Sequence, residues 1–580
     1  MLDYKIIGGQ VFDGTGADPT RADVGIALDR IAAVGDLSRA EAAVTLDVAG
    51  RYVAPGFIDV HSHSDAYLLI EPSAPSKLYQ GVTTEIVGNC GASAAPLADA
   101  AWLPSDWRDQ TYPGEWRSVA DYRRLLEQAR PAPNVMLLIG HGKLRAWVMG
   151  YQARPATADE RRAMTRLLEQ SMDEGGRGFS TGLIYPPGLF AAPEELTDLA
   201  RVAARRDGIY TTHMRSEGPQ LLEAIEETLA IARQTGVRLE ISHLKTSGRN
   251  NWGKAEAALD LIRRARAAGV DVAADRYPYT AGNTDLDVIL PDWAQEGGRD
   301  AVLRRLRDHD EHARLWQEMT ASRPADDWQG VVIGSTAEMA FRGRSLPEVA
   351  QALGVDPVEA ALRLMEGDEL KTSAFFFGMS EDNMWKILAE PYVMLGSDAS
   401  LRSLQGPLSQ DFPHPRAYGA FPKFLRAALD GEAPRGPAVA GRGSLLRRSN
   451  ASGCEGWIFA EPCEARNAIL SCHSSAGATE DHPCDKPQDF LAKKGKTIAL
   501  PEAIRKMTSL PADHFRLAGR GRVAVGNYAD LVIFDPNTVA DRATYAVPHA
   551  LAHGIEGVIV NGVPTLDRNG LTGRRAGRIL

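Results

Sequence analysis

The sequence predicts an α/β protein that combines a (β/α)8 TIM barrel with a small β-sandwich formed by both termini. Two observations predict this fold. In the long middle of the chain, short apolar runs with strand character alternate with amphipathic runs of helical period, which is the pattern of parallel βα units. At both ends, alternating apolar residues and closely spaced glycines favour short antiparallel strands instead.

Length and composition limit the class of protein. The 580 residues suffice for a large catalytic domain and one or two small ones, and 24% charged residues are typical of a soluble globular protein. A net charge of −10 argues against a nucleic-acid partner. The first residues lack the basic and apolar regions of a signal peptide, and no run approaches the roughly 20 apolar residues of a membrane span. We therefore expect a cytoplasmic protein without a membrane partner.

The β-sandwich is predicted over residues 1–54 and 519–580. Its N-terminal part contains short strand-like runs with glycine turns, such as YKIIGGQVFDG (4–14). The segments GRVAVGNYADLVIFDP (521–536) and IEGVIVNGVPTL (555–566) have the same character near the other end. Two strand-rich ends around a long middle indicate one small β-sandwich built from both termini.

The barrel is predicted over residues 55–518. Amphipathic segments that end at glycines, for example 158–176 and 254–269, supply its helices. Eight candidate strands alternate with such segments, and eight βα units close into a barrel. The candidate strands are residues 51–60, 82–89, 134–142, 176–183, 209–214, 238–244, 270–278 and 392–398.

Two segments interrupt the barrel pattern. Residues of about 284–329 are charged and helical, and we expect a small inserted lobe over the barrel mouth. Residues of about 431–495 are rich in Pro, Gly, Arg and Ser at first and lack periodicity, which favours a poorly ordered surface insertion. This insertion also holds four of the five cysteines, so a structural zinc knot is the alternative. Those cysteines are Cys454, Cys463, Cys472 and Cys484.

Metal-binding side chains gather at the predicted C-terminal ends of the barrel strands, where barrel enzymes place their chemistry. They are His61, His63, Cys90, His213, His243 and Asp398. Side chains alternate along a strand, so His61 and His63 leave it on the same face. Imidazole, thiolate and carboxylate together suit Zn²⁺ best. The sequence therefore predicts a zinc-assisted hydrolysis of an amide or similar bond, with Asp398 as the proton carrier.

Two overlapping metal sites are possible at this rim. One would use His61, His63 and Asp398, and the other would use Cys90, His213 and His243. The thiolate of Cys90 could also bridge both.

Several motifs at this rim resemble the amidohydrolase superfamily and, within it, the N-acyl-D-amino-acid deacylases (D-aminoacylases). They are PGFIDVHSHSD (55–65), QGVTTEIVGNCGAS (80–93), FSTGLIYPPG (179–188), THMRSEG (212–218), ISHLKTSG (241–248), GSD (396–398) and HPR (414–416). The resemblance covers nearly the whole chain except about 431–495. Many superfamily members bridge two metals with a carbamylated lysine from strand four, but strand four here, GFSTGL, has no lysine.

The resemblance implies an activity and roles for individual residues. The implied reaction is hydrolysis of N-acyl-D-amino acids to a carboxylate and a free D-amino acid. The implied tight zinc site is Cys90, His213 and His243, with a weaker second site at His61, His63 and Asp398. The substrate carboxylate would be held by Tyr185, Lys245 and Arg416, whose hydroxyl, ammonium and guanidinium groups suit an anion.

Three alternatives remain open at this stage. A peptidase for dipeptides with a C-terminal D-residue would use the same mechanism, and an acidic residue near the acyl pocket would favour it. A cyclic-amide hydrolase is disfavoured by the Lys245 and Arg416 carboxylate clamp, and a non-catalytic scaffold by the complete ligand set. We interpret His414 as structural and leave the role of His141, at the end of strand three, open. The preferred side chain, the acyl group and the oligomeric state are not predicted.

Overall fold

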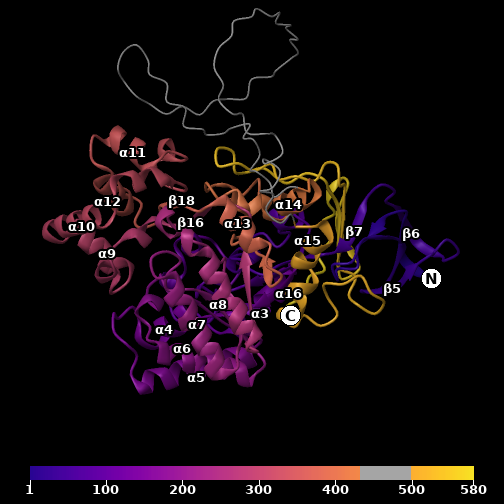
Figure 1. The fold of residues 1–580 in the computed structure, drawn as a ribbon, viewed down its shortest axis with the longest axis horizontal. Helices are drawn as coiled ribbons and strands as arrows, with labels where there is room; N and C mark the ends of the chain where they lie inside the picture. The colour runs from indigo at the N-terminus through magenta and orange to yellow at the C-terminus, as the bar shows by residue number, and fades with distance from the viewer. Residues whose placement is uncertain (432–497) are drawn as a thin grey trace, which may run out of the picture.

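The computed structural model of the protein describes residues 1–431 and 498–580 (Figure 1). The predicted insertion at 431–495 falls outside these residues except for Gly431, so the expectations of poor order and of a zinc knot are not addressed. No helix in the described part of the chain has the length and apolar character needed to cross a membrane.

The predicted parallel barrel is present. Leu138 links β10 to β11, so these two short strands act as one barrel strand. Parallel pairing runs from β8 to β10 and from β11 to β19, and a parallel bridge between Ser62 and Ala399 joins the first strand to the last. The barrel strands are β8 (Phe57–Asp59), β9 (Val82–Val87), β10 (Asn134–Leu137), β11 (Ile139–Gly140), β12 (Gly178–Gly182), β13 (Ile209–His213), β14 (Arg238–Ile241), β15 (Val272–Arg276) and β19 (Val393–Leu395).

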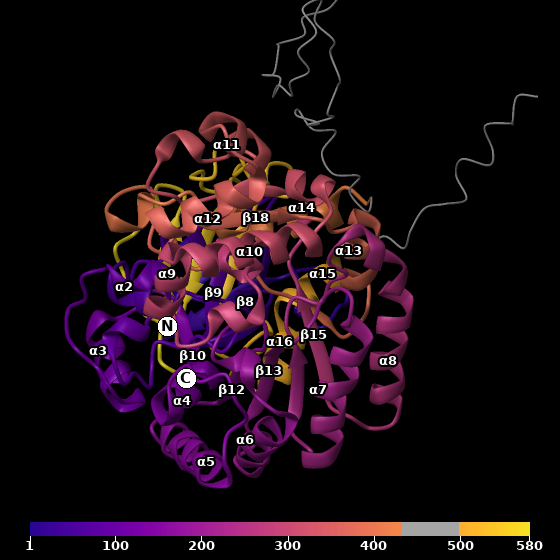
Figure 2. The same ribbon diagram turned by 90° about the vertical axis from the view of Figure 1, so that its left-hand side faces the viewer.

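Amphipathic helices cover the outside of the barrel, and α4 to α8 form an arc around the strands (Figure 2). Local signals set their ends: a capping box between Thr157 and Glu160 begins α5, and Gly236 in the left-handed conformation ends α7. The helices of the barrel are α1 (Pro75–Leu78), α2 (Ser105–Arg108), α3 (Val119–Ala129), α4 (His141–Met149), α5 (Ala158–Asp173), α6 (Pro193–Arg205), α7 (Leu221–Thr235), α8 (Ala255–Ala267), α13 (Glu381–Leu388), α14 (Arg416–Leu429), α15 (Leu500–Met507) and α16 (Ser509–His514).

A buried lysine ties the first strands to the last one beneath the barrel mouth. The side chain of Lys77 is fully buried, and its Nζ lies 2.7 Å from Asp59 Oδ2 and 3.4 Å from Glu85 Oε2. It also donates to Ser397 Oγ at 3.0 Å and to the carbonyl oxygen of Ala399 at 2.9 Å. Since these partners come from β8, β9 and the segment after β19, this contact holds the closure of the barrel.

The β-sandwich is formed by both termini, as the sequence predicts. One sheet contains β1 (Leu2–Ile7), β4 (Asp23–Ala27), β5 (Arg30–Gly35) and β6 (Ala42–Asp47). In the other sheet, N-terminal β7 pairs antiparallel with C-terminal β20. That sheet contains β2 (Gln10–Val11), β3 (Thr20–Arg21), β7 (Tyr52–Pro55), β20 (Leu531–Phe534), β21 (Ile555–Val560), β22 (Val563–Asp567) and β23 (Gly570–Leu571).

The first predicted barrel strand, residues 51–60, divides between the two parts of the fold. Residues 52–55 form β7 of the sandwich, and only residues 57–59 join the barrel as β8. Gly56 lies at the division, where a Cβ would stand 2.2 Å from Thr83 Oγ1. Only glycine therefore allows the chain to pass this closely over the second barrel strand.

A lobe with its own hydrophobic core lies between the seventh and eighth barrel strands. Its antiparallel sheet, in the order β16, β18, β17, packs with four helices around a cluster that runs from Leu286 to Ala374. The lobe is longer than the predicted 284–329, because the Phe-rich strand β18 inserts between β16 and β17. Its elements are β16 (Ala281–Asp285), α9 (Arg299–Arg307), α10 (His309–Ser322), β17 (Val331–Ile333), α11 (Leu346–Leu353), α12 (Pro357–Gly367) and β18 (Ser373–Phe377).

The buried lysine makes a testable contribution to stability. Substitution Lys77→Met leaves Asp59 and Glu85 as buried carboxylates without their cation, so we expect a loss of about 3–5 kcal/mol and a clear fall in the urea midpoint measured by circular dichroism. Arg123→Ala is the control, because its pair with Glu127 is exposed and costs at most about 1 kcal/mol. Equal midpoints for the two variants would contradict this role of Lys77.

Candidate functional site

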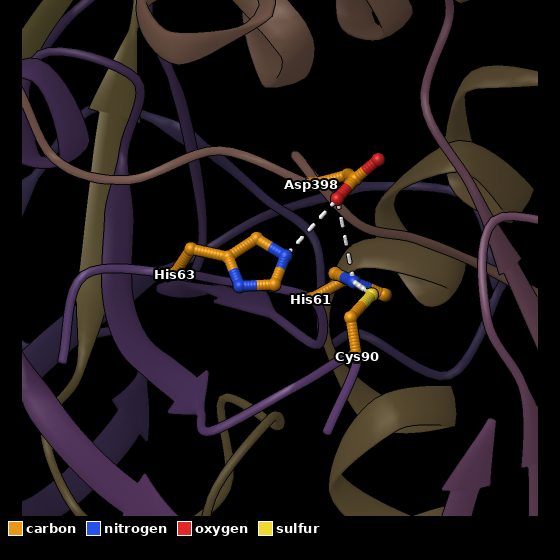
Figure 3. Close-up of side chains that lie close together, drawn as sticks. All are labelled: His61, His63, Cys90 and Asp398. Atoms are coloured by element: carbon orange, nitrogen blue, oxygen red, sulfur yellow. Dashed lines mark hydrogen bonds and ion pairs between the residues drawn. The ribbon is translucent and has the colours of Figure 1, made fainter. Parts of the chain in front are cut away.

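Two overlapping groups of side chains at the barrel mouth could hold a metal ion. In each group, the candidate ligand atoms lie within 4.8 Å of one another. The first group is His61, His63, Cys90 and Asp398 (Figure 3), and the second is Cys90, His213 and His243. The structure thus brings together all six side chains that the sequence predicts as ligands, and a soft thiolate with imidazoles and a carboxylate fits zinc.

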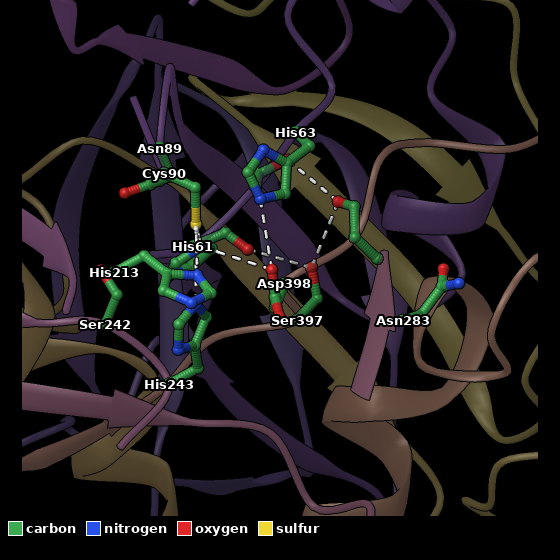
Figure 4. Close-up of polar contacts among 12 residues, drawn as sticks. His61, His63, Asn89, Cys90, His213, Ser242, His243, Asn283, Ser397 and Asp398 are labelled. Carbon is green, nitrogen blue, oxygen red and sulfur yellow. Dashed lines mark hydrogen bonds and ion pairs between the residues drawn. The ribbon is translucent and has the colours of Figure 1, made fainter. Parts of the chain in front are cut away.

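Cys90 is the residue that both groups share. Its Sγ lies 3.3 Å from His61 Nε2, 3.5 Å from His243 Nε2 and 3.8 Å from His213 Nδ1. Figure 4 shows the sulfur pointing toward these rings. Burial alone would raise the pKa of the Cys90 thiol, but the charge of His61 and the imidazole contacts outweigh it and hold the pKa well below its usual range. The thiolate, which is the form that binds metals, is therefore favoured.

Asp398 lies between the imidazoles and a guanidinium. Its Oδ1 is 3.2 Å from His63 Nε2 and 3.4 Å from His61 Nε2, while its Oδ2 is 2.8 Å from Arg416 Nη1. Burial acts to raise the pKa of Asp398, but Arg416 and the neighbouring imidazoles hold it well below its usual range. Asp398 is therefore a carboxylate at neutral pH and can accept a proton.

Three of the six candidate ligands have a strained backbone conformation. Cys90, His243 and Asp398 have φ values of 51°, 37° and 50°, in the left-handed region. Non-glycine residues rarely adopt this conformation, and such residues cluster at functional sites. Each follows the end of a barrel strand by a few residues, so the strain lies at the mouth and not within the sheet.

The segment that carries Cys90 is fixed against strand four. The backbone N–H of Gly91 donates to Ser180 Oγ at 2.9 Å, and Ser180 Oγ donates to the carbonyl oxygen of Gly88. A Cβ at Gly182 would stand 2.1 Å from the carbonyl oxygen of Cys90. Glycine is therefore required at the last position of strand four, because any Cβ there would clash with the carbonyl of Cys90.

Buried carboxylates orient the imidazoles from behind. His61 Nδ1 lies 2.9 Å from Asp275 Oδ2, and His243 Nδ1 lies 2.8 Å from Glu217 Oε1. The sequence analysis missed both acids, although each carried a signal. Asp275 lies one residue before the end of the seventh strand, near the same rim as the candidate ligands, and Glu217 lies within the motif 212–218. Hydrogen bonds of this kind fix which ring nitrogen is free to bind a metal.

The residues predicted to hold a substrate carboxylate line the same cavity as all the candidate ligands except His61. The cavity has a volume of about 1480 Å³, and Tyr185, Lys245 and Arg416 all line it. Between the two cations lies the ring of Tyr277, 5.9 Å from Lys245 Nζ and 4.6 Å from Arg416 Cζ. The sequence analysis missed Tyr277, which follows directly on the seventh strand.

Lys245 and Arg416 both have partners within the chain. Lys245 donates to Glu217 Oε1, and the Nη2 of Arg416 donates to the carbonyl oxygen of Asn283 at 3.2 Å. The ring of Tyr185 lies 5.2 Å from that of His213. Burial, together with nearby negative charge, holds the pKa of Tyr185 well above its usual range, so its hydroxyl remains a donor.

The two remaining histidines of interest have supporting positions. His414 Nδ1 accepts from the backbone N–H of Arg416 at 3.0 Å, and burial lowers the pKa of His414 well below its usual range. His414 is therefore a neutral hydrogen-bond acceptor that helps to place Arg416. His141 is buried, with its Nε2 2.6 Å from Glu195 Oε1, and it does not line the cavity.

Comparison with known proteins gives the family. The model of the amidohydrolase family matches residues 44–432 and 486–566. The N-acyl-D-glutamate deacylase of Alcaligenes xylosoxydans xylosoxydans is 37% identical over 100% of this chain and 96% of its own length. The D-aminoacylase of the same organism is 35% identical over 100% of this chain and 97% of its own.

Solved structures agree with this result. One is the N-acyl-D-glutamate deacylase of Bordetella bronchiseptica, which was solved with zinc and a phosphonate that mimics the tetrahedral intermediate. It is 34% identical to this chain, and the match covers 100% of this chain and 99% of that one with a TM-score of 0.75. A D-aminoacylase described as having a binuclear metal centre, with one-metal activation and second-metal attenuation, is 36% identical, covers 100% of both chains and has a TM-score of 0.75. With the matched barrel and mouth, these relationships mean that the chain belongs to the amidohydrolase family.

Proposed function

We propose that this protein hydrolyses N-acyl-D-amino acids to a carboxylate and a free D-amino acid. The observation that carries the proposal is the meeting, in one cavity, of a thiolate-centred ligand set, the carboxylate of Asp398 and the cations Lys245 and Arg416. Relatives that match the whole chain at 35–37% identity are named as deacylases of this class, which supports the same reaction here.

Cys90, His213 and His243 would hold the tightly bound zinc, and His61, His63 and Asp398 a weaker second ion. Zinc supplies a Lewis acid that polarises the amide carbonyl and makes a nearby water more acidic. The thiolate of Cys90 would make the Cys90, His213 and His243 group the tighter one, since a sulfur ligand is softer than the carboxylate of Asp398 in the other group.

Asp398 would move the proton of the reaction. As a carboxylate at the cavity wall, it accepts a proton from the attacking water while the water oxygen bonds to the amide carbon. It then gives that proton to the amide nitrogen as the carbon–nitrogen bond breaks. The products are the carboxylate of the acyl group and the amine of the D-amino acid.

Lys245, Arg416 and Tyr185 would bind the α-carboxylate of the substrate. The guanidinium offers two parallel donors, the ammonium a point charge and the phenol a single donor. With the carboxylate fixed on this side and the amide carbonyl held near Asp398, only one enantiomer directs its side chain into the remaining space. Such a three-point placement would select one enantiomer, and the relatives named as deacylases of D-amino acids support the D-enantiomer.

One observation favours the dipeptide alternative. Asp285 and Asp287 line the same cavity and form no ion pair within 4.0 Å among the described residues. Burial raises the pKa of Asp285 to about 8 and that of Asp287 to about 6. A dipeptide with a C-terminal D-residue carries an ammonium group that could bind such carboxyls, whereas an N-acetyl group cannot.

The substrate class is tested by primary-amine release from matched N-acetyl-D- and N-acetyl-L-amino acids with several side chains, on zinc-loaded protein. We expect turnover of the D series only, as the names of the full-length relatives support. Dipeptides with a C-terminal D-residue are run in parallel. Turnover of the dipeptides alone would replace the proposal by the dipeptidase alternative, and equal turnover of D and L substrates would contradict it.

The tight zinc site is tested by Cys90→Ala. Loss of a direct ligand should weaken zinc binding by more than the roughly 10- to 100-fold that loss of an outer hydrogen bond costs, as measured by competition with a chromophoric chelator. His63→Ala is the matched variant in the weaker group, and we expect it to keep one tightly bound zinc. Retention of wild-type affinity in Cys90→Ala would refute the assignment.

The proton carrier is tested by Asp398→Asn, which keeps the shape of the side chain but cannot accept a proton. We expect kcat to fall by about 10²- to 10⁴-fold, with one zinc per chain still bound at the Cys90 group. Asp411→Asn is the control: Asp411 also lines the cavity but pairs with Arg402 at 2.6 Å, and its loss should change kcat by only a few-fold. A kcat near that of the wild type in Asp398→Asn would exclude this role.

A further inference from the structure

Glu217 touches three residues of the proposed site from behind. It follows β13 by four residues, and its side chain is 13% exposed. Its Oε1 lies 2.8 Å from His243 Nδ1 and accepts a hydrogen bond from Lys245 Nζ. Its Oε2 lies 3.8 Å from His213 Nε2, a buried nitrogen that has no hydrogen-bond partner among the described residues.

The two histidines present opposite ring nitrogens to the sulfur of Cys90. His213 faces it with Nδ1 and His243 faces it with Nε2. The nitrogens that remain are Nε2 of His213 and Nδ1 of His243, and both face Glu217. An imidazole that binds a metal through one nitrogen carries its proton on the other, so both of these outer protons would point toward a single carboxylate.

We propose that Glu217 is a positioning residue that holds both histidines in the tautomers required for zinc and links them to the substrate clamp. This inference rests on the proposed zinc site. With zinc on His243 Nε2, the ring proton occupies Nδ1 and is donated to Glu217. Lys245 Nζ lies 2.8 Å from the same Nδ1 but then has no acceptor there. Lys245 therefore donates to Glu217 and keeps its other protons for the substrate carboxylate.

No other described carboxylate contacts both histidines. Asp275, the other buried acid at the centre, lies against His61 at 2.9 Å, and the backbone places no acceptor at His213 Nε2 among the described residues. Loss of the negative charge at Glu217 should therefore affect the Cys90, His213 and His243 site and leave the His61 side in place.

The test is the zinc affinity of Glu217→Gln, measured on the full chain by competition with a chromophoric chelator. An amide keeps the shape but offers one acceptor for three donors, so we expect zinc binding to weaken by about 10- to 100-fold. Glu217→Asp retains the carboxylate and should recover part of this loss. Glu227→Gln is the control, because Glu227 pairs with Arg215 at 3.0 Å and should leave the zinc affinity unchanged.

Unchanged zinc affinity in folded Glu217→Gln, with normal binding by the wild type, would overturn this inference and leave the proposed function intact. Absence of zinc binding by the wild type would overturn both. Should Glu217→Gln not fold, Glu217→Asp decides: wild-type affinity overturns the inference, and a several-fold loss supports it. A rise in KM for an N-acetyl-D-amino acid, without a rise for the corresponding carboxamide, would further support the link to Lys245.

Discussion

The buried ammonium of Lys77 is the contact on which the geometry of the barrel mouth depends. A charge removed from water is stable only when opposite charge and hydrogen bonds surround it, and here Asp59 and Glu85 provide the charge. Asp59 also accepts from the backbone N–H of Ser397 at 2.8 Å. The contact that satisfies one lysine therefore sets the spacing between the segment with His61 and the segment with Asp398.

A second buried ion pair, between Asp398 and Arg416, lies at the barrel mouth itself. Arg416 holds the pKa of Asp398 low and so keeps its carboxylate ionised. A substrate carboxylate bound to Arg416 would compete for the guanidinium and weaken this effect, since an added negative charge raises the pKa of a carboxyl group. Substrate binding would thus move Asp398 toward the state in which it can hold a proton and release it to the amine.

Much of the fold and the ligand set was predictable, because both depend on local pattern. The barrel strands are mostly runs of buried residues, and the candidate metal ligands lie at or just beyond their ends, as with His213 after Ile209–Thr212. What could not be predicted depends on contacts between distant segments. The division of the first strand at Gly56 depends on the close approach of Thr83. The length of the lobe depends on β18, which pairs with β16 some 90 residues earlier in the chain. The proposed role of Glu217 depends on two imidazoles that follow different strands. No periodicity in the sequence records such contacts.

The close packing of Gly182 on the carbonyl of Cys90 has a consequence for how the centre is assembled. A carbamylated lysine forms only when dissolved carbon dioxide adds to the side-chain amine, so a centre built on it depends on the supply of that gas. Strand four here has no lysine, and the carbonyl oxygen of Cys90 occupies the space beside its last residue, Gly182. A thiolate is produced by loss of a proton alone, so metal binding at the proposed Cys90 site would not depend on bicarbonate in the surrounding medium.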